Sequence, residues 1–91
     1  MSEATFKTKV IKYLKTRFPN AFIWKVSDQW YAGIPDIYML NEGISYFIEL
    51  KIKGNKASKI QLHTIEKLIS AGANAGVAYS IEDVSKILNL K

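Results

Sequence analysis

The sequence contains no cysteine, a single histidine and only two prolines among its 91 residues. The absence of cysteine excludes disulfide bonds and thiolate metal sites, and His63 by itself cannot build a zinc site. No apolar run approaches the roughly 20 residues that a transmembrane helix needs, and the N-terminal segment contains no apolar signal region. We therefore expect a cytoplasmic protein with no membrane partner.

Arginine is also scarce, although the chain is basic. Lysine and arginine together number 13 against 8 acidic residues, for a net charge of +5, and only Arg17 is an arginine. A basic surface favours phosphate-rich partners such as nucleic acids. Lysine contacts phosphates diffusely, whereas arginine suits the bidentate reading of bases. If the partner is DNA, we expect recognition of its shape or backbone rather than of its sequence.

The hydrophobic pattern predicts one domain over residues 1–91, with elements in the order α-β-β-β-α-β-α. Helices are expected at 2–17, 58–71 and 80–89, and strands at 21–26, 37–40, 44–52 and 75–80. A tight turn at 41–43 should join the second and third strands into an antiparallel hairpin. The third strand, the second helix and the last strand form a crossover unit, so these two strands should be parallel with a right-handed connection.

Three charged residues lie at the ends of the predicted hairpin strands. Asp36 directly follows Pro35, and Glu49 and Lys51 lie two residues apart at the end of the third strand. Side chains alternate along a strand, so Glu49 and Lys51 share a face, and pairing outward from the turn brings Asp36 near Glu49. Adjacent carboxylates repel, and a divalent cation relieves that repulsion. Carboxylate and carbonyl oxygens suit Mg²⁺ or Mn²⁺.

The same residues also have a simpler interpretation. An acid–lysine pair at a strand end is commonly an ordinary cross-strand ion pair, and a Pro-Asp step is common at turns. The order of the features adds weight to the metal site, because Gly33–Asp36, a strand, a tight turn and an apolar strand ending in Glu-x-Lys follow one another. A lysine beside a bound metal can orient or deprotonate a water molecule.

The segments "GIPD" at 33–36 and "IELK" at 48–51 resemble the PD-(D/E)xK nuclease core. With Gln61 after them, they are similar to the virus-type replication-repair nuclease (VRR-NUC) domain, which occurs alone in phages. The resemblance covers nearly the whole chain. It implies an α/β, restriction-endonuclease-like fold, with a mixed central sheet flanked by helices, and metal-dependent cleavage of DNA.

The resemblance also implies roles for individual residues of the hairpin. Asp36 and Glu49 match the metal ligands, and the Leu50 main-chain carbonyl matches a third ligand. Lys51 matches the catalytic lysine. Glu3 is similar to an acid on the first helix of such nucleases, where it would be a further metal ligand, although the helix dipole also favours an acid in a first turn.

Gln61 is similar to a glutamine that helps to organise the active site of this family. A capping box with Ser58 explains the same glutamine without any catalytic role, and both interpretations can hold at once.

Lys25, Lys53, Lys56 and Trp30 are candidates for DNA contact. Lys25 interrupts an apolar strand, so it faces either away from the core or into the site, and related nucleases often carry a basic residue there. Lys53 and Lys56 lie in a basic loop. Trp30 lies in the loop before the motif, where a position in the core or at an interface is the alternative.

The resemblance implies a structure-selective endonuclease that acts on branched DNA such as Holliday junctions. Because one chain carries one site and paired cuts need two, we expect a homodimer. A flap- or nick-directed nuclease, or a general duplex nuclease, in phage replication and repair is an alternative with the same chemistry. A basic DNA-binding module without catalysis is an alternative of another class.

Overall fold

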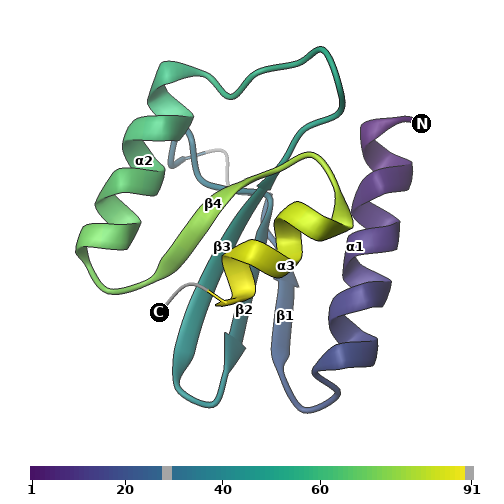
Figure 1. Ribbon diagram of the computed structural model, residues 1–91. Coiled ribbons are helices and arrows are strands. Elements are labelled where there is room, and N and C mark those ends of the chain that lie inside the picture. Colours follow the sequence, from purple (N-terminus) through teal and green to yellow (C-terminus); the bar gives the residue numbers. More distant parts are fainter. Residues whose placement is uncertain (28–29, 90–91) are drawn as a thin grey trace.

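The computed structural model describes residues 1–27 and 30–89 (Figure 1). Within them the elements follow the predicted order: α1 (Glu3–Arg17), β1 (Phe22–Lys25), β2 (Ile37–Asn41), β3 (Ile44–Leu50), α2 (Lys59–Ser70), β4 (Asn74–Ala78) and α3 (Ile81–Asn89). The strands form one sheet in the order β1-β2-β3-β4. Strands β1, β2 and β3 pair antiparallel, and β4 pairs parallel to β3, as the crossover pattern predicts. No helix of the described residues has both the length and the apolar character to span a bilayer.

The hairpin turn consists of two residues, one fewer than predicted, because Asn41 already pairs with Ile44. Glu42 and Gly43 have φ values of 50° and 80°, the left-handed conformation that a type I′ turn requires. This turn sets a register in which Ile37 lies opposite Ile48. The next residues outward are Asp36 and Glu49, so the predicted register is confirmed.

Strand β3 ends at Leu50, two residues before the predicted end at Ile52. Lys51 therefore lies just past the strand, although its N–H still donates to the Ala78 carbonyl at 3.0 Å. That bond continues the β3–β4 pairing by one step and holds the backbone at Lys51 in place.

One face of the sheet is covered by α1 and α3 (Figure 1). The helical stripe Phe6, Val10 and Leu14 of α1 is buried, as its spacing predicts. Together with α3 it packs on the inward side chains of the strands to form the core, which comprises Phe6, Val10, Leu14, Ile37, Met39, Tyr46, Ile48, Leu50, Ala78, Val84, Ile87 and Leu88.

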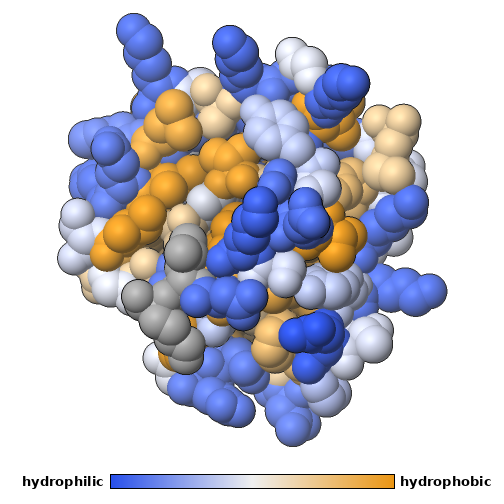
Figure 2. Space-filling view, viewed as in Figure 1, coloured by the Kyte–Doolittle hydropathy of each residue, from blue (hydrophilic) through white to orange (hydrophobic). Residues whose placement is uncertain are grey.

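The opposite face is covered only in part, by α2, which packs against β4. Ile65 of α2 and Ala75 of β4 are buried there, whereas Leu62 and Ile69 are 48% and 52% exposed. Helical spacing places Leu62 and Ile69 close to Ile65 on α2, but only a narrow side of this helix meets the sheet. Figure 2 shows hydrophobic residues along α2 and β4 that remain at the surface.

Candidate active site

Asp36 immediately precedes β2, and the residues just before it are tightly packed. Gly33 has a φ of +83°, and a Cβ on it would lie 2.7 Å from the Ile60 carbonyl oxygen of α2, so only glycine fits. Pro35 is fully buried. The Val26 N–H donates to the Asp36 carbonyl at 2.8 Å, which extends the β1–β2 pairing by one residue. These contacts fix the backbone from which the Asp36 carboxylate projects.

The Asp36 carboxylate has two neighbours from distant parts of the chain. Its Oδ2 accepts a hydrogen bond from the Leu50 N–H at 2.9 Å. Its Oδ1 lies 3.8 Å from the Lys7 ammonium of α1. Lys7 is not among the site residues predicted from the sequence. The available signal was its position four residues after Glu3, which places both on one side of the helix.

Glu49 is the most deeply buried charged residue described, at 2% exposure. Its Oε2 accepts a hydrogen bond from Gln61 Nε2 at 3.0 Å and lies 3.4 Å from the Lys51 ammonium. Its Oε1 is buried and has no hydrogen-bond partner within residues 1–27 and 30–89. Buried carboxylate oxygens are almost always satisfied in folded proteins, so this oxygen is the unusual feature of the site.

The electrostatics of Glu49 follow from this setting. Burial, and then the nearby Asp36 charge, raise the pKa of Glu49 from 4.5 to about 7, against the opposing effect of Lys51. The charge of Glu3 adds a smaller upward contribution. Burial, with the neighbouring Asp36 charge, thus favours the protonated form of Glu49 in the absence of a cation.

Gln61 makes the bonds of a capping box and also reaches Glu49. Its Oε1 accepts from the Ser58 N–H at 2.9 Å, and the Ser58 Oγ accepts from the Gln61 N–H at 3.2 Å, which completes the capping box. The box holds the amide in one orientation and leaves Nε2 to bind Glu49. A cap at the start of α2 therefore also positions a side chain in the site.

Asp36 and Glu49 bring two carboxylates to this end of the sheet, and the Leu50 N–H ties Asp36 to the end of β3; the Leu50 carbonyl as a third ligand stays a prediction. Such oxygen donors are those that hard divalent cations prefer. Glu3 influences Glu49 through its charge. In residues 1–27 and 30–89, no group of three or more histidine or acidic side chains is arranged as a metal site, and the role of Glu3 as a ligand stays a prediction.

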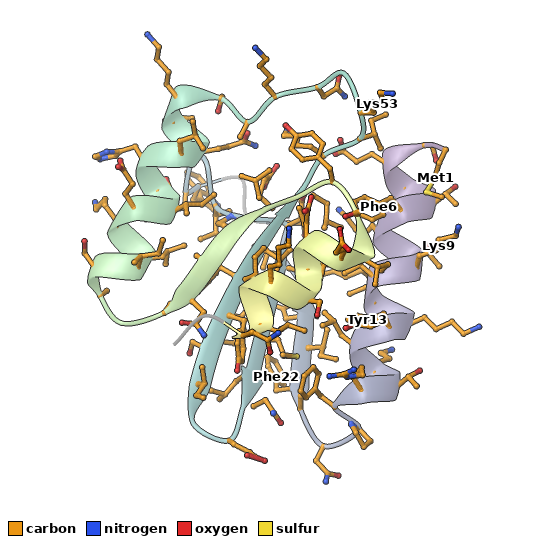
Figure 3. The ribbon with its side chains drawn as sticks, in the orientation of Figure 1. Met1, Phe6, Lys9, Tyr13, Phe22 and Lys53 are labelled. Carbon is orange, nitrogen blue, oxygen red and sulfur yellow. The ribbon has the colours of Figure 1, made fainter. Side chains whose placement is uncertain are left out.

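The candidate DNA contacts come from β1 and from the loops that follow β1 and β3. Lys25 pairs with Ile37, so the alternation of the strand directs it to the face that α1 covers, away from the face of Asp36. Lys53 and Lys56 are exposed in the loop between β3 and α2, and Figure 3 shows Lys53 near the N-terminal end of α1. Trp30 is 97% exposed, so its alternative position in the core is wrong.

The chain matches no family model and no curated protein. Among solved structures, a chain described as "VRR_NUC domain" is similar to it, with a TM-score of 0.70 and 30% identity over 89% of this chain and 91% of that one. A second, described as "VRR_NUC domain protein", has a TM-score of 0.74 and 23% identity over 97% and 85% of the two chains. The similarity to the second chain establishes the fold. The similarity to the first chain includes the amino-acid sequence, over nearly the full length of both chains.

Proposed function

The chain belongs to the VRR-NUC nuclease family, and from this premise we propose that it hydrolyses phosphodiester bonds of branched DNA with Mg²⁺ or Mn²⁺ held by Asp36 and Glu49. The observation that carries the proposal is the buried Oε1 of Glu49, which has no hydrogen-bond partner among the described residues, beside a second acid that raises the pKa of Glu49. A carboxylate buried only to pair with Lys51 would not leave an oxygen unsatisfied next to a like charge.

The residues present fit such a cation. Asp36 and Glu49 supply carboxylate oxygens, and the Leu50 carbonyl lies in the segment between Glu49 and Lys51. When bound, the cation would neutralise charge on the phosphate and activate a water molecule. Glu3 is a further candidate ligand, and its charge already acts on Glu49.

The remaining residues position the reacting groups. Gln61 keeps the Glu49 carboxylate in one orientation through its bond to Oε2. Lys51 has its ammonium 3.4 Å from the same oxygen, where it can align the attacking water and stabilise the charge that develops on the phosphate oxygens. Lys7 brings a second ammonium to Asp36 from α1, where it can bind the phosphate of the incoming strand.

The direct test uses purified protein with Mn²⁺ on a four-way junction, a flap and a linear duplex, across a salt series. The protein should cut branched DNA with Mn²⁺ and lose this activity in EDTA. Asp36→Asn and Lys51→Met should each lower the cutting rate by at least about 100-fold. Glu66→Gln, at an exposed position of α2, is the matched control and should cut at the wild-type rate.

Two results would overturn this proposal. Binding of DNA without any cutting, with Mn²⁺ present, would favour the basic DNA-binding module. Cutting that is indifferent to Asp36→Asn would place the chemistry elsewhere. Calorimetric titration with Mn²⁺ separates these cases, because wild type should bind the ion and the double variant Asp36→Ala/Glu49→Ala should not.

Holliday junctions are the substrate we favour, with a homodimer as the acting species. One chain carries one pair of acids, and symmetric cuts across a four-way junction need two sites. A flap-directed or general duplex nuclease in phage replication and repair would use the same residues, so relative rates on the three DNA forms decide between them. We place this activity in the cytoplasm, where replicating DNA is accessible.

A further inference from the structure

The part of the sheet that α1 and α3 do not cover presents a continuous uncharged surface on β1, β2 and β3. In the register Phe22 lies opposite Leu40, Trp24 opposite Tyr38, and Tyr38 opposite Phe47, so all five side chains point to one face. The ring centroid of Tyr38 lies 6.3 Å from that of Phe22 and 4.8 Å from that of Phe47. We call these five residues the aromatic face.

The aromatic face is too exposed for a surface that meets only water. Phe22, Trp24 and Leu40 are 59%, 52% and 39% exposed, which leaves roughly 300 Å² of apolar side chain in solvent. A standard protein interface buries about 800 Å² per partner, of which a little over half is apolar. These three residues alone thus supply about two thirds of the apolar area that one side of a stable dimer needs.

The charge distribution indicates which partner fits. None of the five residues is charged, and DNA affinity comes mainly from cations placed on phosphates. The lysines that could supply those contacts, such as Lys7, Lys53 and Lys56, belong to α1 and to the loop between β3 and α2. Two copies that each carry a net charge of +5 repel each other, so they associate best through a neutral surface.

We propose that the aromatic face is where two copies of this chain pair, sheet against sheet, about a two-fold axis. This inference rests on the homodimer of the proposed function and names its interface. A two-fold axis brings each patch onto its own copy, and facing sheets pack about 10 Å apart. Asp36 lies two residues before Tyr38 and Glu49 two residues after Phe47, on the same face of the sheet, so the two sites border the interface.

The test measures molar mass by light scattering over a range of concentrations. Wild type should run at twice the 10.3 kDa of one chain. Trp24→Lys and Leu40→Lys, which set ammonium groups against their own symmetry copies, should each raise the dissociation constant by at least about 100-fold. Leu62→Lys, at a similarly exposed apolar position of α2, should leave the dimer intact. Unchanged circular dichroism and melting temperature show that the lysine variants are folded.

The outcomes separate this inference from the proposed function. A wild type that stays at 10.3 kDa up to about 100 µM overturns the interface, even if it cuts DNA. So does a dimer that survives both lysine substitutions. A wild type that dimerises through this face but cuts no DNA would sustain the interface and end the nuclease proposal. If Trp24→Lys leaves the mass unchanged but weakens the binding of a single-stranded oligonucleotide, the face is a base-stacking surface instead.

If two chains pair through the aromatic face, Trp24→Lys and Leu40→Lys should still nick one strand of a junction but should lose paired cuts. Each monomer keeps its own site. Loss of nicking as well, in a folded monomer, would mean that this face acts in catalysis rather than in pairing.

Discussion

Replacing Glu49 with glutamine should stabilise the metal-free protein while abolishing its activity. Glu49 has an unperturbed pKa of 4.5 that the fold raises to about 7, and at 2% exposure solvent does little to screen the effect. Each unit of pKa shift corresponds to about 1.4 kcal/mol. Above pH 7 the ionised side chain therefore lowers the free energy of unfolding by about 3 kcal/mol.

The sign of the pH dependence follows from proton binding. Between pH 4.5 and about 7 the folded protein retains a proton on Glu49 that the unfolded chain has released. The contribution of Glu49 to stability should accordingly improve as the pH falls through this window, and its destabilising effect should be absent below 4.5. Most carboxylates that accept hydrogen bonds or pair with lysines behave in the opposite way.

Glutamine retains the acceptor for Gln61 but gives up the attraction to Lys51, so the expected gain is about 2 kcal/mol at pH 8, shrinking toward zero near pH 5. Urea denaturation followed by circular dichroism in EDTA at pH 5, 6, 7 and 8 measures it. Glu66→Gln, at an exposed position of the same helix as Gln61, should show no such trend. Added Mn²⁺ should stabilise wild type and leave Glu49→Gln unchanged.

Equal destabilisation by Glu49→Gln at every one of these pH values would contradict this prediction. That result would mean that the ion pair with Lys51 dominates over burial and the Asp36 charge. The Glu49 carboxylate would then be a structural partner of Lys51 rather than a metal ligand.

Four further predictions concern neighbouring parts of the site. The rate of Mn²⁺-dependent cutting should fall about tenfold per pH unit as the pH drops below about 7, because Glu49 must be ionised to bind a cation; a flat profile from pH 5 to 8 contradicts this. Gln61→Glu keeps the capping box but replaces the donor to Glu49 with another carboxylate, so both the melting temperature in EDTA and the cutting rate should fall, because like charges repel; an unchanged melting temperature would show that the Gln61 amide does not stabilise Glu49. Gly33→Ala should lower the free energy of unfolding by about 2–3 kcal/mol, whereas Gly54→Ala, with positive φ but no atom within 4 Å of its added Cβ, should cost only about 1 kcal/mol; chemical denaturation compares them. Lys7→Met should weaken DNA binding and reduce the slope of log affinity against log salt by about one, and an unchanged slope would show that Lys7 meets no phosphate.

Local pattern was sufficient for the elements and for the pairing of the two acids. The spacing of Phe6, Val10 and Leu14 predicts α1, because an amphipathic helix buries every third or fourth residue. The two acids could be paired in advance because a tight turn joins neighbouring strands and sets their register over a short stretch of chain. The capping box of Gln61 was readable for the same reason, since its partner Ser58 is three residues away.

Contacts between distant segments could not be read from the same patterns. Strand alternation separates two faces but does not say which one a helix covers, so the orientation of Lys25, the exposure of Leu62 and the open aromatic face around Trp24 emerged only from the docking of the helices. The approach of Lys7 to Asp36, and of Gln61 to Glu49, depends on where α1 and α2 cross the end of the sheet. That placement is set by packing of the whole core, which no local stretch of residues encodes.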